Sequence, residues 1–584
     1  MKRSRTAPQA PPPALVLLFA LVSFALAGCS FIPLLTESTG AGGAAGNGGF
    51  FAAPIVNSAI YSNDFTVDEG PVKGGSARIY ATAPDTYNPL LTRNIYTVAM
   101  LSLVYESLAT IGPDSAVTGR LAERWVPSAD GMIWHVFMRE GLMWHDGRPL
   151  RARDVVDTID RIKSYGGLSP YAGAVSNILS ATATSDLEIR LTLKKENSFT
   201  PYTWVFPIVP SHVMIDALDG AGGGANLRAA LIGSGPYRFY DYENYSGLIL
   251  TSSDTWNAGG DERADNPEDI IPPPYIDKVE FKFYDPAVTA LSQFRSGDVD
   301  LFFSRTMNYF RYKSSSELRI KQYAERDFIF IAFNCSTGVT AARSVRRALL
   351  RMIDRQALID IALEGRGVAA EFPVHPDSPL FEAGIVNVPY DLQAARSILE
   401  NAGYRMDNGV FFGDSGGGWR SLSLTILVNE SDAARCELAD AISKLYAAGG
   451  VVINVLRDSA DSISEKISKG EYDMALLDYR IPLYPDMTEL YSTPWQEEEN
   501  GANPAHYENA DADRLSHELF TLYNEPDRQT AFSELAAIIQ DDAPYIGICF
   551  KAAALVYPDD LRGGIFPNIE NPLNNFENWY IADY

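Results

Sequence analysis

Cysteine is scarce in this chain of 584 residues, which contains four in all. One of them, Cys29, lies in the N-terminal segment, and the others are Cys335, Cys436 and Cys549. Three cysteines cannot all pair within one chain, and these three lie inside or beside apolar runs. We therefore expect buried free thiols, and neither a disulfide framework nor a metal site.

Histidine is also scarce, and its spacing matches no metal-binding motif, because neither H-x-x-x-H nor H-E-x-x-H occurs. The six histidines are His135, His145, His212, His375, His506 and His517. We expect structural histidines, no G-x-S-x-G nucleophile elbow, no enzymatic activity, no cofactor and no bound metal. A binding protein needs only a cavity with aromatic walls and a few polar groups, and 30 Tyr, 28 Phe and 8 Trp are enough to line one.

Basic residues are outnumbered, with 48 Lys and Arg against 74 Asp and Glu, and the formal net charge is −26. Such a surface repels polyanions, so we expect no nucleic acid partner and no direct adsorption of the folded body to anionic lipid. The composition, 46% hydrophobic and 21% charged, is typical of soluble globular proteins. The length exceeds that of one ordinary core and predicts two or three domains.

The N-terminus carries targeting features. Three basic residues among the first five precede an apolar run at 14–26, which is too short for an ordinary membrane-spanning helix. The run ends in Leu-Ala-Gly-Cys29, which resembles the lipobox of bacterial lipoproteins. We predict a lipoprotein signal peptide at 1–28, lipid on Cys29, and a flexible Gly- and Ala-rich tether at 29–54. The protein would then be extracytoplasmic, held by lipid to the outer face of the bacterial cell membrane.

The stretch 121–156 contains strand, turn and helix signals without a gap. A turn dipeptide at 130–131 precedes a run of strand formers at 132–138, and a second turn at 145–149 leads into a helix. The apolar side of the expected strand is formed by Trp134, Val136 and Met138, and that of the helix by Val155, Val156, Ile159 and Ile162. Nothing in this stretch is chemically reactive.

At these residues the chain resembles the large extracytoplasmic solute-binding proteins of ABC importers, family 5, the class that includes oligopeptide- and dipeptide-binding proteins. The family pattern is L-A-E-x-W, a D-G turn, an aromatic strand, R-x-G, then F/W-H-D-G-x-P-L and D-V-V, and the chain keeps nearly all of it. Arg151 stands where the family usually has the Thr that caps the helix. Because such a cap stabilises a helix by about 1 kcal/mol, we expect its absence to weaken only the start of the helix. The resemblance extends from about Gly74 to the C-terminus.

The resemblance implies an α/β fold of two lobes, the periplasmic-binding-protein-like fold of type II in its large peptide-binding class, with an extra inserted domain. Carried onto this chain, it predicts a first lobe made of 55–105, 233–325 and 546–584. It also predicts an inserted domain at 106–232 and a second lobe at 326–545. The lobes would close by a hinge motion on a ligand that contacts both.

The second lobe also has a pattern of its own. Strand signals at 422–428, 451–456 and 472–477 alternate with helical ones such as 438–445, which predicts a parallel or mixed sheet. In such sheets ligands bind beyond the carboxyl ends of the strands, and here that position is the segment 478–486.

Two segments supply the candidate ligand-binding residues. The resemblance implies a loop that lines the ligand cleft from the first lobe, formed by Arg93, Asn94, Ile95 and Tyr96. The candidates in the second lobe are Asp478, Tyr479, Arg480, Pro482 and Asp486.

Pro482 stands where oligopeptide-binding members carry the Asp that holds the α-ammonium of the peptide. Proline supplies neither a charge nor an N–H. An unpaired buried ammonium costs on the order of 2–5 kcal/mol, so either Asp478 or Asp486 replaces the lost carboxylate, or the ligand lacks a free amino terminus. Tyr479 keeps an aromatic wall where the family commonly has Trp, and Arg480 adds a partner for an acidic ligand.

These expectations combine into one function. The resemblance implies a substrate-binding lipoprotein of an ABC transporter, acting as a monomer, which captures an extracellular peptide or peptide-like solute and delivers it to the membrane permease. The alternative is a receptor lipoprotein that reports an extracellular peptide to a signalling partner. The residues do not distinguish the two.

Overall fold

The computed structural model describes residues 70–112, 115–218, 224–243, 246–256, 273–308, 319–383, 385, 387–414, 418–493, 503–568 and 570–582. The predicted signal peptide, the lipidation site Cys29 and the predicted tether lie outside these residues. Within the described ranges, no helix combines the length and the apolar composition needed to cross a membrane.

A four-stranded sheet of order β1-β10-β9-β8 begins the described part of the chain. Its strands are β1 (Ser76–Thr82), β8 (Tyr237–Glu243), β9 (Gly247–Ser252) and β10 (Lys278–Tyr284). β1 runs parallel to β10 and the other neighbours are antiparallel. Helix α1 (Ile95–Ser102) contacts β1, and α4 (Gly224–Ala230) contacts β8. Ile79 and Phe281 are buried in the core of this sheet, and Trp579 near the C-terminus lies in the same core.

The stretch with the strongest sequence signals belongs to a second four-stranded sheet, of order β4-β5-β7-β6 with antiparallel neighbours. Its strands are β4 (Ala122–Pro127), β5 (Ile133–Met138), β6 (Ile178–Ala183) and β7 (Glu188–Leu193). Alternate residues of β5 are buried, and they are Trp134, Val136 and Met138. Helix α2 (Ala152–Tyr165) contacts β6 and β7 and buries Val155, Ile159 and Ile162. The predicted succession of strand, turn and helix is confirmed.

The start of α2 shows how the departure at Arg151 is accommodated. Arg151 occupies the N-cap position and its side chain makes no capping bond. Its backbone N–H instead donates to the Asp154 carboxylate at 2.9 Å, which is the reverse half of a capping box. The absence of Thr therefore affects only the N-cap of α2, as expected.

The largest sheet has seven strands in the order β11-β20-β12-β19-β17-β18, with β13 paired to β20. Its strands are β11 (Phe302–Ser304), β12 (Arg319–Phe333), β13 (Gly367–Ala369), β17 (Ser423–Asn429), β18 (Val452–Asp458), β19 (Met474–Arg480) and β20 (Tyr545–Tyr557). β17 runs parallel to both β18 and β19, whereas β12 pairs antiparallel with β19 and β20. The sheet is therefore mixed, which is one of the two arrangements, parallel or mixed, that the sequence predicted.

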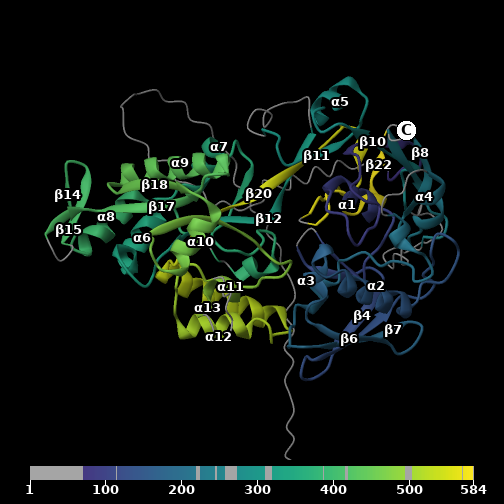
Figure 1. Cartoon of the computed structure of the whole chain (residues 1–584), viewed down its shortest axis with the longest axis horizontal. Helices are drawn as coiled ribbons and strands as arrows, with labels where there is room; N and C mark the ends of the chain where they lie inside the picture. The colour runs from purple at the N-terminus through teal and green to yellow at the C-terminus, as the bar shows by residue number, and fades with distance from the viewer. Residues whose placement is uncertain are drawn as a thin grey trace, which may run out of the picture. The chain divides into compact units, whose positions relative to one another are not determined.

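Helices accompany this sheet and carry the apolar faces that pack against it. Figure 1 shows α9 (Ala433–Gly449) beside β17 and β18, which it contacts. The other helices of this part of the chain are α6 (Arg343–Arg351), α7 (Arg355–Ala362), α8 (Leu392–Asn401), α10 (Ala460–Ser468), α11 (Thr488–Tyr491), α12 (Ala510–Glu518) and α13 (Glu525–Asp542).

Two strands far apart in the sequence, β12 and β20, lie side by side over most of their length (Figure 1). Their register shifts between Ala324 and Phe328, so three residues of β12, 325–327, stand against a single residue of β20. This is a β-bulge, and bulges re-aim side chains and bend the strand. These three residues, Glu325, Arg326 and Asp327, are all charged, and they form the charged triplet of β12.

Helix α1 ends at Ser102. The carbonyls of Leu103 and Val104 accept hydrogen bonds from the backbone N–H groups of Tyr237 and Gly235, at 3.0 and 2.8 Å. A Cβ on Gly235 would lie 2.5 Å from the Leu103 carbonyl oxygen, so this approach requires glycine. Pairing with the turn at 233–237 replaces the helical hydrogen bonds and ends the helix.

One stretch fits the letters of G-x-S-x-G, at 413–417, although no nucleophile elbow was expected. Residues 415–417 lie outside the described part of the chain. The flanking segments are β15 (Val410–Asp414) and β16 (Trp419–Ser421), which pair antiparallel beside β14 (Arg405–Asp407). A nucleophile elbow joins a strand to a helix, so the context of this stretch is different.

The three cysteines of the folded body are free thiols, as predicted. Cys436 and Cys549 are buried, whereas Cys335 is half-buried, which is less than expected. Burial raises the pKa of the Cys549 thiol to about 12 and that of Cys335 to about 11. A thiol reacts as the thiolate, so these pKa values leave both groups unreactive near neutral pH.

His145 fastens the turn at 233–237. Its Nε2 lies 2.9 Å from the Gly235 carbonyl oxygen, and its Nδ1 accepts from the Gly233 N–H at 3.2 Å, which assigns the proton to Nε2 of a neutral ring. Burial lowers the pKa of His145 from 6.5 to about 4, only partly opposed by the Gly235 carbonyl. The unfolded chain therefore binds this proton below about pH 6.5 while the folded chain does not, and stability falls as the pH drops through that window.

We predict that His145→Gln is destabilised at pH 7 but that its deficit relative to the wild type shrinks by about 2–3 kcal/mol on going to pH 4.5, because the variant lacks the buried imidazole. Urea unfolding at several pH values measures the difference. His517→Gln, exposed on α12, is the matched control and should show no such change. A deficit for His145→Gln that stays constant from pH 7 to 4.5 would contradict the prediction.

Candidate functional site

A cavity of about 550 Å³ lies within the range of about 300–1,000 Å³ that is usual for small-molecule sites. Its walls come from the start of α1, from 170–174, from the single helical turn η3 (Thr200–Thr203), from Phe303 and Arg305 around the end of β11, and from the bulged part of β12. The remaining wall consists of Arg480 and residues 482–484, at and beyond the end of β19, together with Asn568, Glu570 and Pro572.

Four guanidinium groups line this cavity, and three of them have a carboxylate partner. Arg305 pairs with Glu325, and Arg326 lies 3.4 Å from Glu570. Arg480 lies 3.2 Å from Asp327 of the neighbouring strand. Arg326 also donates from Nε to the Ile481 carbonyl at 2.7 Å, which ties β12 to the segment after β19. Burial raises the pKa of Glu325, and Arg305 opposes this shift.

The fourth guanidinium, that of Arg93, is held by backbone groups instead. Its Nη2 donates to the carbonyls of Gly167 and Leu168, at 3.1 and 3.3 Å. Its backbone N–H donates to Asp85 at 2.9 Å. Arg93 is exposed, and its neighbour Ile95 also lines the cavity, so two of the four predicted first-lobe residues lie on the wall.

The other two first-lobe candidates, Asn94 and Tyr96, do not line the cavity. Asn94 caps α1, because its Oδ1 accepts from the Tyr96 N–H at 2.9 Å and its Nδ2 donates to the Thr82 hydroxyl at 3.0 Å. The ring of Tyr96 packs against Phe303 with 4.8 Å between centroids, and burial raises the pKa of Tyr96 to about 12. The expected loop is the start of a helix, whose side chains point in different directions at 3.6 residues per turn.

In the second segment, Arg480 and Pro482 line the cavity but Asp478, Tyr479 and Asp486 do not. The predicted strand end was wrong, because β19 continues to Arg480 alongside β12. Asp478 is therefore a strand residue, and it pairs with Arg435 at 2.5 Å and with Lys551 at 3.6 Å.

Asp486 is likewise occupied. It accepts from the N–H and the hydroxyl of Thr488, at 2.9 and 2.6 Å, at the start of α11. Burial raises the pKa of Asp486, and the bonds from Thr488 oppose the shift. Neither Asp478 nor Asp486 thus lines the cavity that Pro482 lines.

The predicted aromatic wall is present, but Tyr484 forms it rather than Tyr479. Tyr484 stacks on Phe199 with 5.8 Å between centroids and 9° between planes. Burial raises the pKa of Tyr484 to about 12. The other aromatic residues on the wall are Tyr171, Tyr202, Phe303 and Tyr323.

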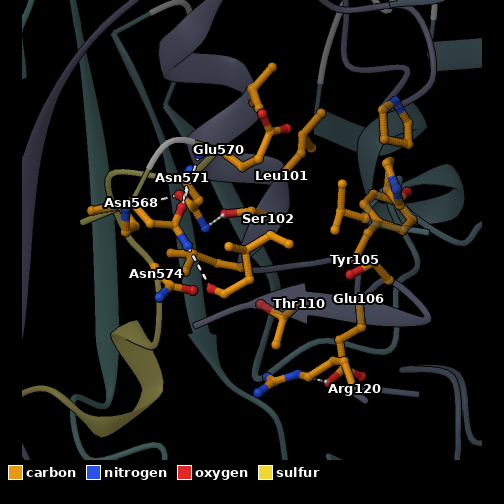
Figure 2. A pocket seen from close by; sticks show the side chains of 18 of the residues that line it. Leu101, Ser102, Tyr105, Glu106, Thr110, Arg120, Asn568, Glu570, Asn571 and Asn574 are labelled. Atoms are coloured by element: carbon orange, nitrogen blue, oxygen red, sulfur yellow. Dashed lines mark hydrogen bonds and ion pairs between the residues drawn. The ribbon is translucent and has the colours of Figure 1, made fainter. Parts of the chain in front are cut away.

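A smaller cavity of about 140 Å³ adjoins the first. The residues that line both are Thr92, Val98, Tyr171, Val205, Asn568 and Glu570. Figure 2 shows Arg120 paired with Glu106 at one end and Asn571 turned towards Ser102 at another. Arg120 also pairs with Glu577 at 2.6 Å. The guanidinium of the smaller cavity is thus already paired.

The polar side chains on the walls of the larger cavity are guanidinium, carboxylate, hydroxyl and amide groups. The described residues that line the larger cavity include Thr and Tyr hydroxyls but no histidine or cysteine. Within the described ranges, no group of three or more His, Cys, Asp or Glu side chains could hold a metal ion.

Sequence reasoning missed Arg305, Glu325, Arg326 and Glu570. A signal existed for two of them, because Glu325-Arg326-Asp327 is a charged triplet at the head of an otherwise apolar run that ends at Phe333. Arg305 and Glu570 lie in short connections and carry no local signal.

Comparison with known proteins gives the family. The family model of bacterial extracellular solute-binding proteins, family 5 middle, matches residues 116–502. The oligopeptide-binding protein AppA of Bacillus subtilis is 23% identical over 525 residues, which is 88% of this chain and 92% of AppA. The nickel-binding periplasmic protein of Escherichia coli is 22% identical over 519 residues, which is 83% of this chain and 92% of that protein.

Among solved structures, HbpA2 from Haemophilus parasuis is similar with a TM-score of 0.70 at 19% identity, covering 87% of this chain and 99% of HbpA2. This likeness concerns the fold, which is the two-lobed α/β fold of periplasmic binding proteins predicted from the sequence. With the match over 116–502, it places the protein among binding proteins: the chain belongs to the bacterial extracellular solute-binding proteins of family 5.

Proposed function

We propose that this protein captures an extracellular peptide or peptide-like solute and delivers it to the membrane permease of an ABC transporter. The observation that carries the proposal is the cavity of about 550 Å³, which has aromatic walls and lies in a chain of family 5. The oligopeptide-binding relative supports a peptide, whereas the nickel-binding relative means that family membership alone does not define the ligand. No observation favours the signalling receptor.

We further propose that Arg93, Ile95, Arg480 and Pro482 are ligand contacts, since these four of the sequence-predicted residues line the cavity. The two lining carboxylates, Glu325 and Glu570, are engaged by arginines. A ligand ammonium would have to compete with an arginine for one of these carboxylates, because no other carboxylate is found among the described lining residues. The solute is therefore not held through a free amino terminus.

Calorimetry tests this proposal with a pool of short peptides and its N-acetylated counterpart. We predict that acetylation changes the affinity by less than about threefold, because no carboxylate is free to pair with the ammonium. Uptake of the labelled N-acetylated pool should fall in a strain that lacks the protein. Strong binding of free peptides that acetylation abolishes would refute the mode of recognition, and undiminished uptake would refute the transport role.

The domain boundaries remain a proposal. We propose that the first lobe comprises 55–105, 233–325 and 546–584, the inserted domain 106–232 and the second lobe 326–545. Both proposed crossings between the lobes fall within strands, one at the bulge of β12 and the other at the start of β20, and this supports a hinge there.

Small-angle scattering tests the hinge. We predict that the radius of gyration falls when the N-acetylated peptide pool is added, because a ligand that contacts both lobes favours the closed form. Addition of free glycine at the same concentration is the control. A radius that is unchanged at saturating ligand would count against closure.

We also propose that lipid on Cys29 anchors the protein outside the membrane, on the strength of the basic start, the short apolar run and Leu-Ala-Gly-Cys29. Cys29→Ser removes the acceptor thiol, so the variant should appear in the medium or the soluble extracytoplasmic fraction. Cell fractionation and immunoblotting measure this, with Cys335→Ser as the control that stays with membranes. A Cys29→Ser protein that is as firmly membrane-bound as the wild type would contradict the anchor.

A further inference from the structure

The charges on the cavity wall do not balance. Arg305, Arg326 and Arg480 are matched by Glu325, Glu570 and Asp327, one carboxylate to each guanidinium. Arg93 is left over, because among the described residues no carboxylate lies within ion-pair distance of its guanidinium. The whole chain carries a net charge of −26, so a surplus cation at this position is not a reflection of composition.

Asp85, which binds the backbone of Arg93, does not pair with its guanidinium. Asp85 accepts from the Arg93 backbone N–H at 2.9 Å, from the Thr92 hydroxyl at 2.5 Å and from the Thr86 N–H at 2.9 Å. These bonds use Asp85 to build the turn before α1. Its carboxylate fixes the backbone of Arg93 and leaves the guanidinium charge alone.

The guanidinium is nevertheless held in place. Nη2 donates to the carbonyls of Gly167 and Leu168, just beyond the end of α2, where the backbone of Gly166 has a positive φ of 54°. Only the Nη2 donors are used, so Nε and Nη1 have no partner among the described residues. Nε and Nη1 lie on different edges of the guanidinium, so each can donate a separate charge-assisted hydrogen bond to an anion.

The start of α1 adds to the same preference. Ile95, its first residue, lines the cavity next to Arg93, and the first turn contains no acidic residue. The N-terminus of a helix carries partial positive charge and favours an anion. The two positive features thus lie at one edge of the cavity.

We propose that Arg93 forms an anion subsite that receives a carboxylate of the transported solute, so that the solute is a peptide-like acid with net negative charge. The proposal rests on the proposed function and names the chemical class of its ligand. A carboxylate suits the site better than a phosphate, because one surplus guanidinium balances one negative charge whereas a phosphate dianion would bring two.

The test uses two pools of short peptides without Asp or Glu, both N-acetylated. One pool has free C-terminal carboxylates and the other has C-terminal amides. We expect calorimetry to show that the wild type binds the acid pool about tenfold or more tightly than the amide pool, since a hydrogen bond to a charged group contributes about that much. The preference should weaken as salt is added.

Three variants separate the subsite from general electrostatics. Arg93→Gln should bind both pools with equal, low affinity, and Arg93→Lys should keep part of the preference because it keeps the charge but not the guanidinium donors. Arg153→Gln, at an exposed position on α2, makes the same change in net charge and should behave as the wild type. Circular dichroism melting checks that each variant is folded.

The outcomes are distinguishable. Equal binding of the two pools by the wild type overturns the subsite and leaves the peptide-binding function standing. Failure of the wild type to bind either pool overturns both. Competition by millimolar inorganic phosphate that disappears in Arg93→Gln overturns the assignment to a carboxylate and identifies a phosphate site instead.

Discussion

The pairing of β12 with β20 is the constraint on which the rest of the structure depends. The two strands join residues more than two hundred positions apart, from Arg319 opposite Tyr557 to Ala332 opposite Tyr545. A continuous ladder would turn alternate residues to alternate faces. The bulge between Ala324 and Phe328 breaks that alternation, and the charged triplet 325–327 occupies the break.

The bulge explains why charge is tolerated inside so apolar a sheet. From Phe328 to Phe333 every residue of β12 is buried, and these residues divide between two hydrophobic cores. Charges placed there would need partners to offset the cost of leaving water. Glu325 and Arg326 instead stand at the wall of the cavity, and the three charges of the triplet pair with Arg305, Glu570 and Arg480. The cavity thus lies where the main sheet changes from apolar to charged.

Much of the fold could be predicted because its signals are local. The strand with Trp134 and Val136 and the helix with Val155 and Ile159 each bury one side of a regular pattern, and the pattern is visible in the sequence. Asn94 was taken for a ligand contact although an Asn just before an apolar helical run is also a capping signal, and the cap is what the structure contains.

The site itself was less predictable, for a physical reason. Ion pairs such as that of Arg326 with Glu570 join residues 244 positions apart, so no local pattern records which charges are neutralised. Asp478 and Arg480 look alike as charged residues near the end of a strand. They differ because Asp478 pairs with Arg435 and Lys551 and does not line the cavity, whereas Arg480 lines it. The charge left over at Arg93 becomes visible only after all such pairs are assigned.

The most direct measurement of this account is a crystal structure of the protein with a bound N-acetylated peptide acid. The account predicts the peptide in the cavity beside the bulge of β12, its carboxylate within about 3 Å of Nε or Nη1 of Arg93, and the pairs of Arg305 and Arg326 unbroken. A carboxylate bound elsewhere, with Arg93 still facing solvent, would contradict it.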